Sequence, residues 1–212
     1  MINIVELTYT ETERQSVGKA ICDVLDGSID VAWIRGVGDG VICDEIASRF
    51  HNSLNALSRK DEVPGTMVGE SHYFKKPDDY YARCKESMVA VDALFEVGKN
   101  PIKRLYSLVQ EYRGGVLRAA RYNGRDALHT RAIAWKEMPG SEFLLRPHDD
   151  VSQVFCERNE GWEICNIKTL LAINFYAQCE AGEGMLKVFD LKHTPELAER
   201  AGVVRCAKSK GS

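Results

Sequence analysis

The residues with the clearest chemical potential are His148 and Asp150, in the segment Leu144–Val151. This segment has the pattern of a β-strand. Because side chains alternate faces along a strand, His148 and Asp150 point to one side and Asp149 to the other. An imidazole and a carboxylate that converge supply two of the three ligands of a two-histidine, one-carboxylate site, which suits non-haem Fe(II). The sequence therefore predicts metal ligands at His148 and Asp150, the alternative being a polar turn at an exposed strand end.

The remaining histidines carry less information. His51 falls in a predicted helix, His72 in a polar loop and His129 just before a predicted strand. We expect each of them to be a surface or capping residue.

The composition is that of one globular domain. The chain has 212 residues, 44% hydrophobic and 28% charged, with a net charge of -3. It has no long basic run, which argues against a nucleic-acid or anionic-membrane partner. No signal peptide and no apolar run of about 18 residues is present, so we expect a cytoplasmic protein. Seven scattered cysteines without a CxxC pair favour reduced thiols over disulfides or a structural zinc site.

The first half of the chain is mostly helical by its periodicity, with two short strands and one long Gly- and Pro-containing loop that could act as a lid. Expected strands are 2–9 and 31–35, expected helices are 12–25, 41–55, 80–97 and 101–113, and the loop is 58–79. Gly36-Val37-Gly38 resembles the start of a nucleotide-binding fingerprint. Val41 occupies its third glycine position, so a tight strand-to-helix turn is the better interpretation.

Strand-like segments follow Gly114-Gly115, separated by turn clusters; they are 131–135, 143–150, 169–177 and 185–191. We therefore predict a single α+β domain over residues 1–212, helical over about 1–115 and β-rich over about 116–212.

Three stretches together resemble the Fe(II)/2-oxoglutarate-dependent dioxygenase superfamily. Met138–Asp150 is similar to the approach to its HxD motif. Leu170–Tyr176, followed by Glu180–Phe189, is similar to its hairpin with a Gly-rich turn and a G-x-L-x-V-aromatic strand. Val31–Val37 with the next helix is like its N-terminal strand and helix. The layout is closest to the branch that hydroxylates or halogenates free small molecules.

The resemblance implies a double-stranded β-helix, jelly-roll-like, with the N-terminal helices packed outside the sheets. It also implies Fe(II), 2-oxoglutarate as cosubstrate and dioxygen, with formation of succinate and CO2. The substrate would be a small molecule such as an amino acid or a natural-product intermediate. Related halogenases have Gly or Ala at the position of Asp150, so a carboxylate there favours hydroxylation or desaturation.

The third ligand is the point where the chain departs from the family. A second histidine, then an Arg or Lys that pairs with 2-oxoglutarate, normally lies several strands after the hairpin. Here only His193 follows, in a loop-like segment. His193 is one candidate for the third ligand. We expect instead either that the last strands and this ligand lie beyond Ser212, or that the site is incomplete. In the second case the chain is a β-helix protein that binds a ligand or partner without redox chemistry.

Substrate contacts are less defined by the sequence. Residues 152–167 could form a loop beside the metal, with Arg158 and Trp162 as contacts. A surface hairpin with a half-buried Trp162 is the other interpretation.

The strand register makes a prediction about metal binding. His148→Ala and Asp150→Ala should each abolish Fe(II) binding, whereas Asp149→Ala should not, because Asp149 faces away. Anaerobic Fe(II) titration of the three variants measures this. Loss of binding in Asp149→Ala alone would mean that the register is shifted by one residue.

Overall fold

In this computed structural model the described residues are 1–59, 65–73, 75–136, 161–167, 169–180 and 184–190, with Gly140 and His148. The chain forms two compact units. Unit 1 contains residues 1–56, 89–118 and 171–190, and unit 2 contains residues 57–88, 119–170 and 191–212. The boundary at residues 88 and 89 falls inside one helix, α3 (Pro77–Asp92). Each unit is described by itself below.

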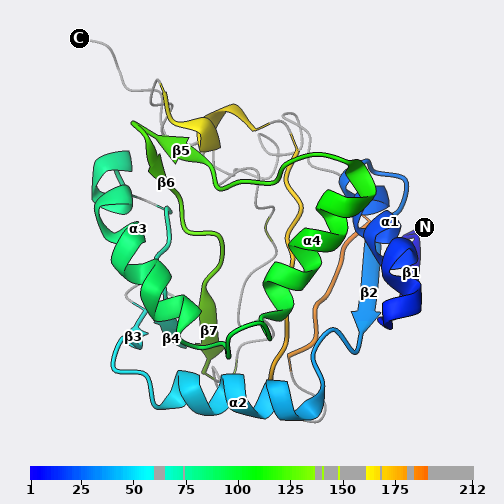
Figure 1. Cartoon of the computed structure of the whole chain (residues 1–212), viewed down its shortest axis with the longest axis horizontal. Coiled ribbons are helices and arrows are strands. Elements are labelled where there is room, and N and C mark those ends of the chain that lie inside the picture. The colour runs from blue at the N-terminus through cyan, green and yellow to red at the C-terminus, as the bar shows by residue number, and fades with distance from the viewer. Residues whose placement is uncertain are drawn as a thin grey trace. The chain divides into compact units, whose positions relative to one another are not determined.

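Unit 1 begins with a strand, a helix and a parallel strand, coloured blue in Figure 1. β1 (Ile4–Thr8) pairs with β2 (Val31–Arg35) in parallel, with Leu7 opposite Ile34. Between them lie the 3₁₀ turn η1 (Glu11–Glu13) and α1 (Arg14–Leu25). These bounds confirm the predicted strands 2–9 and 31–35 and the predicted helix 12–25. The prediction succeeds because the apolar periodicity of each element is strong and lies within the element itself.

Capping residues fix the ends of the other two helices of unit 1. In α2 (Gly40–His51), the Asp39 side chain accepts a hydrogen bond from the backbone N–H of Ile42 at 2.8 Å. In α4 (Pro101–Arg113), Asn100 caps the N-terminus and Gly114 ends the helix at a φ of 69°, in the left-handed region that glycine adopts without strain. The Gly36-Val37-Gly38 segment is a turn before α2, as predicted, with Gly36 at a φ of 73°.

The core of unit 1 lies between α1, α4 and the β1–β2 pair. Its buried members are Tyr9, Val17, Ile21, Cys22, Val37, Leu105, Leu108 and Val109. At Gly18 the two helices approach so closely that a Cβ would lie 2.7 Å from the backbone oxygen of Leu108. Across the same pair, Arg14 bonds to Glu111 at 2.6 Å.

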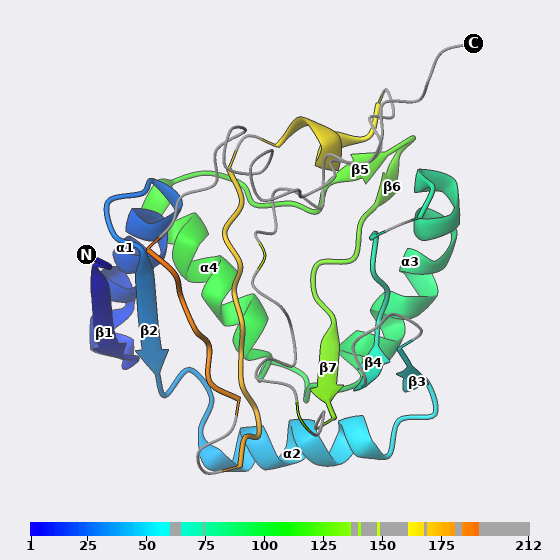
Figure 2. The ribbon, with the colours of Figure 1, turned by 180° about the vertical axis from the view of Figure 1, so that it is seen from behind.

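Two extended segments belong to unit 1: 184–190 runs alongside β2, and 171–180 runs alongside 184–190, as Figures 1 and 2 both show. Burial alternates along 171–180: Leu171, Ile173 and Phe175 are half-buried and pack on the core of unit 1, while the residues between them are exposed. This period of two is that of a one-sided strand. The described residues of 169–190 contain no helix, as the prediction of strands there requires.

Unit 2 contains an antiparallel sheet in the order β3 (Leu57–Ser58), β4 (Gly65–Val68), β7 (Ala132–Trp135). The strand predicted at 131–135 is confirmed. The prediction of one long loop over 58–79 is wrong, because β4 lies inside it. A run of only four residues beside a Gly- and Pro-containing stretch gives too weak a periodic signal, and its pairing partner is about 67 residues away.

A second core lies beside this sheet in unit 2. The hairpin β5 (Arg121–Tyr122) and β6 (Arg125–Asp126) turns at Asn123-Gly124, with φ values of 48° and 75°. An Asn-Gly pair is typical of such two-residue turns. Its core partners are α3 and the 3₁₀ turn η3 (Glu163–Asn166). The buried residues are Tyr80, Tyr81, Cys84, Ala127 and Trp162.

A buried carboxylate ties α3 to the end of β4. Glu70 is 6% exposed; Lys75 and Arg83 bind its carboxylate, Arg83 at 3.2 Å, and the backbone N–H of Ser71 donates to it at 3.0 Å. Burial would raise the pKa of Glu70, but the hydrogen bonds from Lys75 and Ser71 and the nearby positive charges outweigh it, so the pKa lies below its ordinary value.

The sequence predicts reduced cysteines and no membrane-spanning segment, and the described residues can be compared with both predictions. Among the described residues, Cys22, Cys43 and Cys84 are free thiols. Within the described ranges, no helix has the length and apolar character needed to cross a membrane.

The close approach at Gly18 predicts a steric cost. Gly18→Ala should lower the free energy of unfolding by about 1–3 kcal/mol, because backbone must move to admit the methyl group. Urea denaturation measures this. Gly40→Ala is the control, since a Cβ there meets no atom within 4 Å, and it should be neutral or stabilise by at most about 1 kcal/mol. Equal effects of the two changes would contradict the packing of α1 on α4.

The Glu70 cluster predicts a pH-dependent stability. The pKa of Glu70 is lowered in the folded state. Its contribution to the free energy of unfolding is therefore complete above the pKa that it has in the unfolded chain, and is lost as the pH falls through its folded-state pKa. Glu70→Gln should cost about 1–3 kcal/mol of unfolding free energy at pH 7. The cost should shrink toward pH 3. The control is Glu6→Gln, which removes an exposed ion pair with Arg35 and should cost under about 1 kcal/mol. A Glu70→Gln cost that does not change with pH would contradict the arrangement.

Candidate functional site

Of the predicted metal ligands, the structure describes His148, whose side chain is exposed. Asp150, Asp149 and His193 lie outside the described residues, as does Arg158. The register that places His148 and Asp150 on one face therefore remains a prediction. The exposed imidazole is accessible to a metal ion from solvent.

The donor types fit Fe(II) in chemical terms. A neutral imidazole and a carboxylate are ligands of the two-histidine, one-carboxylate kind, and both can be deprotonated near neutral pH. Among the described residues no three His, Cys, Asp or Glu side chains are grouped as a metal site. Asp150 and His193 are not among these residues, so the predicted ligand set remains a prediction.

A second set of functional groups gathers at one end of the β4–β7 sheet. Antiparallel pairing of Val68 with Ala132 brings the residues after β4 to the residue before β7. There the guanidinium of Arg131 donates from Nη1 to Ser71 Oγ at 3.0 Å, and its Cζ lies 5.0 Å from the centroid of the Tyr73 ring. We call Ser71, Tyr73 and Arg131 the Arg131 cluster.

The ring cluster beside it is a packing core. Tyr80, Tyr81 and Trp162 are each 3–4% exposed. The indole Nε1 of Trp162 donates to the Tyr81 hydroxyl at 3.1 Å, and the Tyr80 hydroxyl accepts from the backbone N–H of Leu128 at 3.1 Å. Trp162 is thus neither a half-buried surface residue nor accessible to a substrate in this arrangement.

Burial also sets the protonation states of this core. It is the main cause of the raised pKa of Tyr80, and neighbouring Cys84 adds to it. Burial likewise raises the pKa of the Cys84 thiol. Both groups are therefore protonated near neutral pH, and Cys84 is not an activated nucleophile.

The prediction for His72 needs correction, because its ring is not a surface group. His72 is half-buried, with its centroid 4.4 Å from that of Tyr73 and its ring edge-on to Tyr80 and Trp162, at 6.0 and 6.3 Å. His129 is also half-buried. His51, the last residue of α2, is exposed, as predicted.

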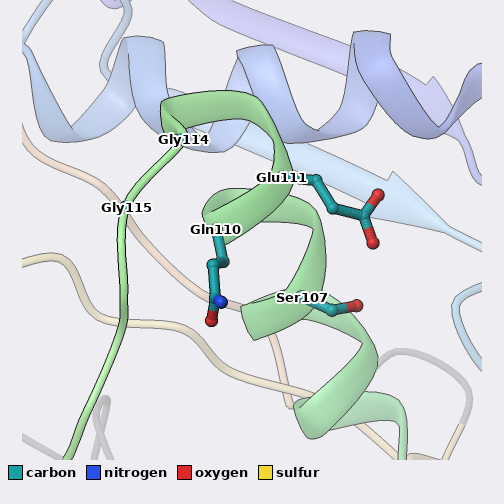
Figure 3. Close-up of a pocket in the computed structure, with 5 residues that line it drawn as sticks. All are labelled: Ser107, Gln110, Glu111, Gly114 and Gly115. Carbon is teal, nitrogen blue, oxygen red and sulfur yellow. The ribbon is translucent and has the colours of Figure 1, made fainter.

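A pocket of about 400 Å³ lies in unit 1 at the C-terminal end of α4, lined by Ser107, Gln110, Glu111, Gly114 and Gly115. Figure 3 shows Gln110 and Glu111 pointing away from each other rather than into a shared centre. Glu111 is also paired with Arg14. The lining offers no imidazole or thiol, so the pocket does not form a reactive site by itself.

Sequence reasoning missed the Arg131 cluster. Ser71 and Tyr73 belong to segment 58–79, for which the sequence predicts a long loop, and Arg131 is the first residue of the predicted strand 131–135. The pairing of β4 with β7 brings them together, and the available signal was the strand-like run Gly65-Thr-Met-Val68.

The chain has a distant relative among characterised proteins. It is 24% identical over 182 residues to L-isoleucine 3(1)-dioxygenase of Pantoea ananatis (strain AJ13355). The match covers 81% of this chain and 61% of the relative, so the chain spans about three fifths of the relative's length. No family model and no solved structure matches the chain. The similarity supports a relationship to dioxygenases at the level of a superfamily.

Proposed function

We propose that this chain carries the His148-x-Asp150 part of a non-haem Fe(II)/2-oxoglutarate-dependent oxygenase that hydroxylates a free amino acid. The observation that carries the proposal is the match to an enzyme named for isoleucine oxidation. A contiguous match over 81% of a 212-residue chain must include residues 148–150, wherever it begins. The similarity therefore spans the segment that the sequence alone singles out for metal binding.

The arrangement of the described segments supports the double-stranded β-helix as the proposed fold. Residues 171–177 alternate in burial as a strand on a helical layer does, and α1 and α4 form that layer in unit 1. In unit 2, β4 and β7 pair antiparallel. A jelly-roll fold uses antiparallel strands with helices packed outside the sheets.

In this proposal His148 and Asp150 hold Fe(II) together with a third ligand. When bound, the metal would activate dioxygen, the oxidant; one oxygen atom goes to 2-oxoglutarate, which leaves as succinate and CO2, and the other goes to the amino acid. The contribution of the chain is to bind and orient the substrate and to keep water away from the reaction. Asp150 occupies a ligand position that an external halide would otherwise need, which favours hydroxylation over halogenation.

The test is substrate-dependent succinate formation. The protein from its complete reading frame is supplied with Fe(II), 2-oxoglutarate, dioxygen and, in turn, isoleucine, leucine, valine and a charged amino acid. We expect succinate and a product heavier by one oxygen atom with an aliphatic amino acid. Absence of succinate with every amino acid, in protein that still binds Fe(II), would reject the proposal in favour of a binding protein without redox chemistry.

Removing the carboxylate of Asp150 makes a sharper prediction. Asp150→Gly should lower hydroxylation by at least about a hundredfold, since one ligand to the metal is lost. Chlorination in the presence of chloride is a permitted product. Asp149→Ala is the matched control and should retain turnover. Succinate and hydroxylated amino acid are measured for both variants, and unchanged turnover in Asp150→Gly would remove Asp150 from the metal.

A further inference from the structure

The side chain of Arg131 is held in place by neutral groups. Its Nη1 donates to Ser71 Oγ at 3.0 Å, and its guanidinium lies over the Tyr73 ring at 5.0 Å. Ser71 Oγ also accepts from the backbone N–H of Tyr73 at 3.3 Å, so the hydroxyl and the ring are fixed to each other. Arg131 is half-buried.

The carboxylate closest in sequence to the Arg131 cluster is already paired with other cations. Glu70, next to Ser71 in the chain, is bound by Lys75 and Arg83. In the described part of the chain, Arg131 has no carboxylate partner. Glu70 thus has two cationic partners, Lys75 and Arg83, while Arg131 beside it in the fold bonds to the neutral Ser71. A half-buried guanidinium with only neutral partners gives up part of its hydration without a counter-charge.

The geometry leaves the remaining donors of Arg131 for a ligand. Arginine has five N–H donors in a planar fork, and Nη1 to Ser71 is the hydrogen bond from this guanidinium in the described structure. The Tyr73 ring lies over one face of the plane, and among the described residues the other N–H groups of Arg131 make no hydrogen bond. Carboxylates bind to such an edge through two parallel hydrogen bonds.

We propose that the Arg131 cluster binds the carboxylate group of a small-molecule ligand. The ligand identities rest on the proposed function, which requires two molecules with carboxylates, an amino acid and 2-oxoglutarate. Arg131 provides the charge, Ser71 sets its orientation, and Tyr73 holds its plane. The amino acid and 2-oxoglutarate both carry a carboxylate, and separate titrations of the two show which one Arg131 binds.

The experiment measures binding rather than turnover. Isoleucine, isoleucinamide and 2-oxoglutarate are titrated separately into the protein from its complete reading frame, without metal and with Ni(II) under nitrogen, by calorimetry. Arg131→Met should weaken binding of isoleucine or of 2-oxoglutarate by about tenfold to a hundredfold. If isoleucine is the ligand, Arg131→Met should not weaken isoleucinamide further, because the partner group is absent.

Two further variants keep the test specific. Ser71→Ala should weaken the same ligand about threefold to tenfold, because Arg131 loses its orienting acceptor. The matched control is Arg125→Met. Arg125 also lies over aromatic rings, those of Tyr81 and Tyr122 at 5.8 and 5.5 Å, but it is paired with Asp78. Its removal should leave both affinities unchanged. Thermal unfolding of each variant checks that it is folded.

The outcomes separate this inference from the proposed function. Unchanged affinities for both ligands in a folded Arg131→Met variant would overturn the inference, even if the enzyme forms succinate. A wild-type protein that binds neither ligand would overturn it too. Arg131-dependent binding without any succinate formation would uphold the carboxylate site and reject the oxygenase.

Discussion

The buried carboxylate of Glu70 is the interaction on which the arrangement of unit 2 depends. It lies just after β4, and through Arg83 and Lys75 it fixes the following turn to α3. Ser71 and Tyr73 belong to that turn. A carboxylate this deeply buried is stable only while its cations and the Ser71 N–H remain in place. Glu70 is paired with Lys75 and Arg83, while Arg131 has Ser71 and Tyr73 as its partners among the described residues.

Unit 1 depends on a different constraint, the contact between two helices at a glycine. With no side chain at Gly18, α1 lies directly against the backbone of α4 at Leu108. This layer receives the alternate side chains Leu171, Ile173 and Phe175 from a segment that follows α4 by more than fifty residues. An apolar face on the helical layer therefore selects one face of the later segment, which is how helices packed outside a sheet specify strand register.

Local patterns predicted most elements, and non-local pairing explains the failures. Apolar periodicity and caps such as Asn100 were sufficient for β1, α1, β2 and α4, because each signal lies within the element. β4 was missed because four residues carry little periodicity and its partner β7 is distant in sequence. His72 was misplaced for the same reason: Tyr80 and Trp162, which surround it, belong to α3 and to a segment about 90 residues further on.

The predicted metal ligands and the Arg131 cluster also differ in whether their signal is local in the sequence. A histidine and an aspartate two residues apart can be recognised in any strand, because alternation places both side chains on the same face. Whether an arginine is a structural cation or a ligand anchor depends on which carboxylates lie near it after folding. In unit 2, Arg125 and Arg131 both lie over tyrosine rings. Among the described residues, Arg125 is paired with Asp78, whereas Arg131 has only Ser71 and Tyr73 as partners. That difference is a property of tertiary charge pairing. Hence the metal ligands could be proposed from the sequence, while the carboxylate anchor required the structure.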